Sequence, residues 1–273
     1  MIPPTSIDGT DITGATIDGT DVTEITVDGD TVFTAAPTLP VRYTDLVIWA
    51  PFDASQYGGS NTDDVTAIIG GSGDDTAYNV DDGGNSHVQS GVFDINAGKP
   101  SGAYKIDNNA FLNTDRPPVT QTFTDMVWVN ADSFSTGSIQ NIIRPDEGGS
   151  NRRGLVRFET NSNTIDYGMH DQSGNFTFLN GGLGSFNTNE WYHIAWNYDG
   201  SEVKVYGDGN LLDSSSYSQT ISNAKISLGG VTFFGGSEFL VNGLIDDFRH
   251  YNVVLTASEI DQIYQNTDPA QNP

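Results

Sequence analysis

The sequence predicts an all-β protein: an antiparallel β-sandwich of the jelly-roll class, with a small N-terminal β-meander arm and a short C-terminal helix. Between residues 46 and 252, short apolar or alternating runs are separated by clusters of Gly, Asn, Asp and Ser. Ten-residue repeats occupy the start of the chain, and a helical pattern appears only after residue 255. Regularly spaced short strands with such turns are typical of sandwiches and jelly rolls.

The first segment, residues 1–36, repeats a ten-residue unit three times. Each unit carries Asp-Gly, the dipeptide that best supplies the positive φ angles of a tight hairpin turn. The few aliphatic side chains bury too little area for a stable isolated meander, so we expect the arm to dock or oligomerise. A flexible polar leader is the alternative. The aligned positions expected to form the assembly surface are Ile7, Ile12, Ile17, Val22, Val27 and Val32.

The rest of the chain divides into a linker at 37–44, a jelly roll at 45–266 and a tail at 267–273. Two prolines between polar residues indicate that the linker is short and stiff. Within the jelly roll, the clearest strand evidence is the alternation in residues 190–207, which predicts a hairpin. Its first strand places Tyr192, Ile194, Trp196 and Tyr198 on one face, and Asp199-Gly200 supplies the turn.

The helix is expected over residues 256–266. Thr256 and Glu259 have the spacing of a capping box, in which each side chain bonds the backbone N–H of the other residue. Ile260, Ile263 and Tyr264 share one side of this helix and predict its buried face.

Composition limits the partners. Acidic residues number 36 against 11 basic ones, giving a formal net charge of -25, which argues against nucleic acid and anionic membrane. The surplus is mostly Asp, 29 of the 36, which suits either calcium binding or a halophilic surface that stays hydrated in high salt. There is no cysteine, and no apolar run approaches the roughly 18 residues needed for membrane insertion.

Three segments carry a family resemblance: "FTDMVWVNADSF" at 123–134, "EWYHIAWNYDGSEVKVYGDGNLL" at 190–212 and "GLIDDFRHYNVVLTASEIDQIYQN" at 243–266. In this order they resemble laminin G-like, concanavalin A-like jelly rolls, and the third is the most specific. The resemblance covers roughly residues 45–266. The N-terminal decapeptides resemble leaders of structural proteins of tailed viruses, including those of salt-loving archaea.

The resemblance implies one structural calcium ion that ties the first strand to the last. The matching positions are Asp53 in "APFDAS" and Asp246 or Asp247 in "IDDF". Carboxylates brought together from both ends of the chain repel each other unless a cation lies between them. The alternative is that Asp246 or Asp247 pairs with Arg249 or another base.

Although the chain is strongly acidic, residues 144–157 contain a cluster of arginines. Arg152 and Arg153, in an apparent loop, are the candidate ligand-binding residues, because a guanidinium bonds carboxylates and sulfates in a bidentate manner. With this cluster the loop could grip an anionic glycan or an acidic protein. The alternative is that the arginines only balance local acids.

No catalytic residues are expected. Sugar hydrolases that use this jelly roll carry two carboxylates on one strand face, commonly as Glu-x-Asp-x-x-Glu, and this motif does not occur here. The nearest pair, Glu259 and Asp261, falls in the expected helix. The four histidines show no metal-ligand spacing.

The sequence therefore predicts a non-enzymatic surface protein, such as the fibre, spike or turret of a tailed virus, located on the virion surface. We expect the arm to bind copies of itself and other virion proteins, and the jelly roll to bind a host surface glycan or glycoprotein. A secreted, extracellular adhesin or carbohydrate-binding module is the first alternative. A purely structural capsid or tail component is the second.

Overall fold

A computed structural model shows a chain of two compact units, Met1–Pro40 and Val41–Pro273. The described residues are 45–50, 102–106, 112–114, 120–134, 137–145, 152–222, 224–233 and 236–267, with short strands in 6–34 and at 65–66, 79–81 and 92–99. The boundary between the units falls within the stretch expected to be a linker. Each unit is described by itself.

The described residues of the first unit form three two-stranded antiparallel sheets. They pair β1 (Ser6–Ile7) with β2 (Thr10–Asp11), β3 (Thr16–Ile17) with β4 (Thr20–Asp21), and β5 (Glu24–Val27) with β6 (Asp30–Thr34). An Asp-Gly dipeptide separates the two strands of each pair, as the repeat predicts. A continuous meander would also need pairing between repeats, and the described residues show none. Ile7, Ile17, Val27 and Val32 lie in these strands, whereas Ile12 and Val22 lie outside the described residues.

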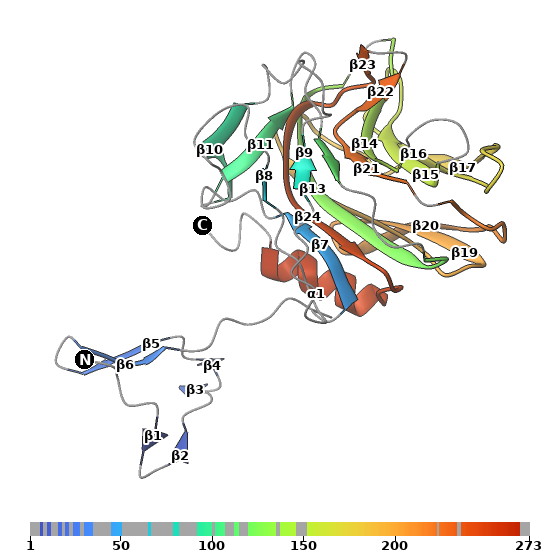
Figure 1. Ribbon diagram of the computed structural model, residues 1–273. Coiled ribbons are helices and arrows are strands. Elements are labelled where there is room, and N and C mark those ends of the chain that lie inside the picture. The colour runs from blue at the N-terminus through green and yellow to red at the C-terminus, as the bar shows by residue number, and fades with distance from the viewer. Residues whose placement is uncertain are drawn as a thin grey trace. The chain divides into compact units, whose positions relative to one another are not determined.

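The second unit is a sandwich of two antiparallel sheets (Figure 1). One, here called the helix-side sheet, has the order β10 (Val92–Lys99), β11 (Gly102–Ile106), β24 (Asn242–Tyr251), β13 (Phe123–Ser133), β18 (Trp191–Tyr198), β19 (Glu202–Gly207) and β20 (Asn210–Ser216), and β7 (Leu46–Ala50) also pairs with β24. The other, here called the opposite sheet, has the order β17 (Phe176–Leu183), β16 (Ile165–His170), β15 (Gly154–Phe158), β14 (Gln140–Pro145), β21 (Ile226–Leu228), β12 (Leu112–Thr114), β9 (Asn79–Asp81) and β8 (Val65–Thr66). A separate hairpin joins β22 (Val231–Phe233) to β23 (Gly236–Glu238).

The core lies between the two sheets, because alternate residues of each strand point inward. On β18, Ile194, Trp196 and Tyr198 are buried there and Tyr192 packs against them, which confirms the predicted face. The predicted hairpin is also present, since Tyr198 pairs with Val203 across the turn. The structure therefore confirms the jelly-roll sandwich.

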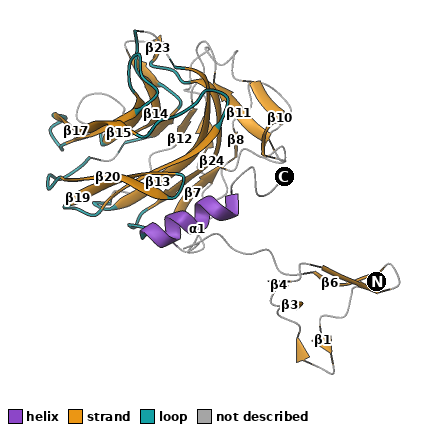
Figure 2. Ribbon diagram, turned by 180° about the vertical axis from the view of Figure 1, so that it is seen from behind, coloured by secondary structure: helices purple, strands orange, loops and turns teal. Residues whose placement is uncertain are grey.

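Helix α1 (Ala257–Thr267) covers the outer face of the helix-side sheet (Figure 2). The predicted capping box is present, because the Thr256 N–H donates to Glu259 Oε2 and the Glu259 N–H donates to Thr256 Oγ1. Ile260 and Ile263 are buried against this sheet, and Tyr264 stacks on Trp128 of β13 at 5.6 Å between ring centroids. In the described part of the chain no helix is long and apolar enough to cross a membrane.

Candidate functional site

A row of polar side chains crosses the outer face of the opposite sheet. Strand register places Asn141 on β14 beside Arg157 on β15, and Arg157 beside Asp166 on β16. Directly paired residues point to the same face of a sheet. The Arg157 guanidinium bonds Asp166 in a bidentate manner, Nε to Oδ1 at 2.5 Å and Nη2 to Oδ2 at 2.9 Å. Asn141 is 0% exposed, and neither atom of its amide has a hydrogen-bond partner within the described residues.

Two exposed phenylalanines lie beside this row on β17, the edge strand of the same sheet. Phe176 is 42% exposed and Phe178 is 53% exposed. They pair with His170 and Gly168 of β16, which places both rings on the outer face. The Phe176 ring lies over Gly168, where an added Cβ would come within 2.5 Å of its Cζ, and it packs 4.8 Å from the His170 ring. The two rings therefore form an exposed apolar pair on this face.

Glu159 connects the polar row to the aromatic pair. Its Oε1 accepts from the Gly182 N–H at 3.2 Å, and its Oε2 accepts from the Thr164 hydroxyl at 2.5 Å. A Cβ added at Gly181 would collide with Glu159 Oε1 and would lie 3.1 Å from Phe178 Cζ. The absence of a side chain at Gly181 therefore lets the carboxylate and the ring occupy the same part of the surface. We call Phe176, Phe178, Glu159, Arg157 and Asp166 the aromatic face.

The aromatic face contains one cationic group, Arg157, and two carboxyl groups, Asp166 and Glu159. Burial raises the pKa of Asp166, although the hydrogen bond and charge of Arg157 oppose this effect. The nearby Glu159 carboxylate raises the same pKa further, because like charges disfavour a second ionised group. The pKa of Asp166 is therefore raised overall, and the bond to Arg157 makes this rise smaller than burial and Glu159 alone would produce.

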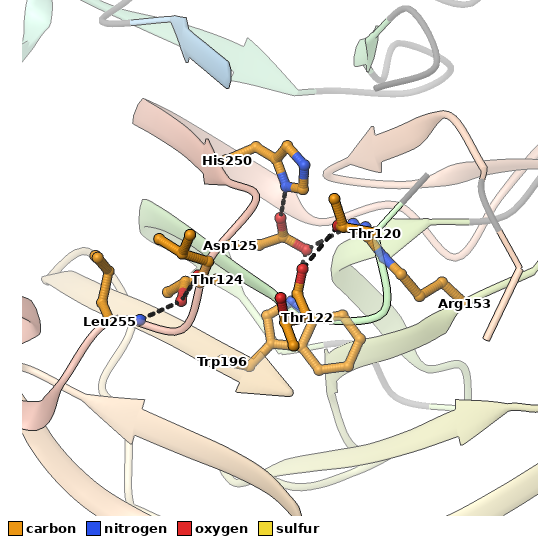
Figure 3. A network of polar contacts seen from close by, with 9 residues as sticks. Thr120, Thr122, Thr124, Asp125, Arg153, Trp196, His250 and Leu255 are labelled. Atoms are coloured by element: carbon orange, nitrogen blue, oxygen red, sulfur yellow. Dashed lines mark hydrogen bonds and ion pairs between the residues drawn. The ribbon is translucent and has the colours of Figure 1, made fainter. Parts of the chain in front are cut away.

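A second polar cluster lies in the sandwich interior (Figure 3). Asp125 on β13 is fully buried and faces His250 on β24 and Trp196 on β18 in register. Its Oδ1 accepts from His250 Nδ1 at 2.5 Å, and its Oδ2 accepts from Arg153 Nη2 at 3.0 Å and from Trp196 Nε1 at 3.1 Å. The Arg153 guanidinium also lies over the Phe123 ring, 4.1 Å from its centroid. Burial lowers the pKa of His250, although the charge and hydrogen bond of Asp125 oppose this effect.

The structure corrects the expectation for Arg153. This residue is 2% exposed and bonds Asp125 in the interior, so it does not lie in an accessible loop and cannot contact a surface ligand. The reason is that a buried carboxylate needs a compensating charge, and Arg153 at the entry to β15 supplies it. Arg152 is partly buried next to it, and its role in ligand binding stays a prediction.

Two of the three aspartates proposed as calcium ligands, Asp246 and Asp247, lie on the outer face of the helix-side sheet. Asp247 forms a bulge in β24 with a φ of 47°, and its carboxylate accepts from Arg249 Nε at 3.1 Å and Nη2 at 3.0 Å and from Trp49 Nε1 at 2.6 Å. The alternative pairing with Arg249 is therefore present. Asp246 is buried beside it, and Asp53 lies outside the described residues. Calcium at this place stays a prediction.

Sequence reasoning did not identify the aromatic face. The signal available was the alternation in "NFTFLN", which places Phe176 and Phe178 on one side of a strand. The same alternation is typical of core residues. Only the strand order shows that β17 is an edge strand and that its rings lie on the outer face.

The fold and these sites define a two-sheet β-sandwich with a helix-covered face and an aromatic outer face. The sequence of residues 102–261 matches the laminin G-like family described as the concanavalin A-like lectin/glucanases superfamily, and the chain belongs to this family. The resemblance inferred from sequence is thus confirmed over these residues. A search of curated proteins found no match to this sequence.

Solved structures with a similar fold include domain 4 of AbnA, a GH43 extracellular arabinanase from Geobacillus stearothermophilus, in complex with arabinotriose. Its TM-score is 0.57 at 16% identity, over 81% of this chain and 98% of that chain. The receptor-binding domain of botulinum neurotoxin type G gives 0.57 at 14% identity, over 81% of this chain and 51% of that chain. The chain thus spans about half the length of that botulinum structure. At these identities the likeness shows the fold alone.

The interior cluster predicts a large effect of Asp125→Asn. The amide keeps the shape of the side chain but leaves the Arg153 charge buried and uncompensated, so we expect a loss of about 3–5 kcal/mol in the free energy of unfolding. Urea denaturation measures it. The matched control is Glu202→Gln, which breaks the partly exposed Lys204–Glu202 pair at 2.8 Å and should change stability far less, because water screens an exposed pair. Equal losses in the two variants would contradict a central role for Asp125.

His250 predicts a pH dependence. Because burial lowers its pKa below the ordinary value of 6.5, the unfolded chain binds a proton that the native chain does not. Stability should therefore fall as the pH drops through about 6.5, by up to about 1.4 kcal/mol per pH unit. His250→Asn keeps a donor for Asp125 without titrating in this range. The free energy of unfolding of both proteins is measured in urea at several pH values between 7.5 and 5.5. As the pH falls, the wild type should lose stability relative to the variant. A difference that stays constant with pH would contradict the role of His250.

Proposed function

We propose that the jelly roll is a non-enzymatic binding domain that attaches to a glycan or glycoprotein on a cell surface, and that the aromatic face is its binding site. The observation that carries this proposal is the pair of exposed rings, Phe176 and Phe178, beside a fixed row of hydrogen-bonding groups. Sugars offer an apolar C–H face and a rim of hydroxyls, which match a ring and a polar row respectively. Membership of a lectin/glucanase family supports the same role.

Two of the similar structures also support binding. Domain 4 of AbnA was solved with arabinotriose, and the botulinum structure is a receptor-binding domain. Binding by a shallow polar surface is weak at a single site, because each new hydrogen bond replaces one with water. Several copies on one particle would raise the effective concentration and strengthen attachment about 100-fold or more.

The carboxylates of the aromatic face favour binding over hydrolysis. A retaining glycosidase needs two carboxyl groups about 5 Å apart, each free to act on the sugar. Here Asp166 uses both oxygens to bond Arg157, and Glu159 uses both oxygens to bond Gly182 and Thr164. Each carboxylate is committed to holding the surface in place.

We expect Phe178→Ala to lower glycan affinity about tenfold, because truncating an aromatic residue at the centre of a binding site commonly removes more than about 1 kcal/mol. The measurement is titration calorimetry of the full chain with a ligand found on a glycan array, together with a search for cleavage products. Leu211→Ala is the matched control, since Leu211 is equally exposed at 52% but lies on β20 of the other sheet. Equal weakening in both variants, or release of shorter sugars, would contradict the proposal.

We further propose that the chain is a fibre, spike or turret component on the surface of a tailed virion, with the first unit docking to copies of itself and to other virion proteins. Three hairpins built on one repeat, joined to a recognition fold, support this arrangement. The acidic net charge of -25 suits a halophilic setting, and a structural calcium ion held by Asp53 and by Asp246 or Asp247 belongs to the same proposal. A gene neighbourhood of capsid and tail genes would favour the virion, whereas an adjoining glycosidase module would favour a secreted exoprotein.

Deletion of residues 1–36 should convert an oligomer into a folded monomer, because the arm's aligned aliphatic residues have little of their own to pack against. Light scattering measures the mass, and circular dichroism checks that the jelly roll is still folded. A truncated protein with the same mass per particle as the full chain would show that assembly resides elsewhere. If the assembled protein binds no envelope yet the particle cannot form without it, the chain is a purely structural component.

A further inference from the structure

We infer that the aromatic face selects uncharged glycans and disfavours acidic ones, and that Glu159 is the residue that determines this selectivity. The inference rests on the proposed function, because it names the ligand class of the same surface. It differs from the expectation that arginines in this region grip an anionic glycan.

The first step is the charge balance of the face. The positive charge of Arg157 is matched by the bidentate bond to Asp166. Glu159 then adds a negative charge, and its partners among the described residues, the Gly182 N–H and the Thr164 hydroxyl, are both uncharged. Of the other described arginines, Arg153 and Arg249 are buried and paired with carboxylates, Arg144 on β14 is buried, and Arg152 is partly buried.

The second step is the position of this negative charge. Glu159 Oε1 and Phe178 Cζ both lie at the point where a side chain on Gly181 would be. A sugar stacked on the Phe178 ring would therefore have its substituents within a few ångströms of the carboxylate. Repulsion between two unit charges at such a distance near a protein surface corresponds to a weakening of roughly tenfold or more.

The third step is the hydrogen-bonding capacity that remains. A guanidinium carries five N–H donors, and Arg157 uses two of them on Asp166. Each carboxylate oxygen of Glu159 and Asp166 accepts one bond within the protein and has a second lone pair, which is an acceptor beside those donors. A hydroxyl group both donates and accepts, so it can use both kinds of group, whereas an ionised acid can only accept.

The test is a glycan array that pairs neutral oligosaccharides with their uronate, sulfated or sialylated counterparts, probed with the full chain. We expect neutral members to bind and each acidic counterpart to bind at least about tenfold more weakly, with the difference shrinking as salt is raised. Glu159→Gln keeps the bonds to Gly182 and Thr164 but removes the charge. It should strengthen binding of the acidic counterparts several-fold and so reduce the selectivity.

Glu202→Gln is the matched control, because it removes the same charge from the other sheet, where Glu202 pairs with Lys204. If this control changes the selectivity as much as Glu159→Gln does, the net charge of the chain and not Glu159 sets it, and the inference fails. Acidic glycans that bind as tightly as neutral ones would overturn the inference and leave the proposed function standing. If no glycan of either kind binds, the proposed function fails as well.

Discussion

The Asp125 carboxylate is the point at which several distant segments of the sandwich are joined. Its two oxygens receive hydrogen bonds from His250 on β24, from Trp196 on β18 and from Arg153 just before β15. The first two bonds reinforce the register within the helix-side sheet, and the third crosses to the opposite sheet. Because β15 carries Arg157, the placement of the polar row depends on where Arg153 anchors the start of that strand. An interior ion pair thus contributes to the geometry of an outer surface.

The arginines explain how so acidic a chain keeps its folded state. Arg153, Arg157 and Arg249 each neutralise an aspartate that is wholly or largely removed from water. Desolvating a carboxylate is unfavourable unless a cation accompanies it, so these few bases are used where the dielectric constant is lowest. Exposed acids such as Asp199 and Asp261 face solvent, where ions screen them within about 8 Å at physiological salt.

Local patterns allowed much of the fold to be predicted. The capping box before α1, the Asp-Gly hairpins and the alternation in β18 each depend on residues close in sequence, and the structure contains all of them. The buried position of Arg153 could not be predicted in this way. Its partner Asp125 is 28 positions away in the sequence and is brought near only by the packing of the two sheets. Phe176 and Phe178 were missed for a related reason. Alternation predicts a face, but strand order decides whether that face is core or surface.

The three hairpins of the first unit have a consequence for how this protein can change over generations. Each described two-stranded sheet is centred on one Asp-Gly dipeptide and pairs only with itself. Duplication or loss of one thirty-nucleotide unit in the gene would therefore add or remove a whole hairpin without breaking a described pairing elsewhere. A segment built in this way can lengthen or shorten by recombination between its own repeats, while the sandwich that follows keeps its sequence and its register.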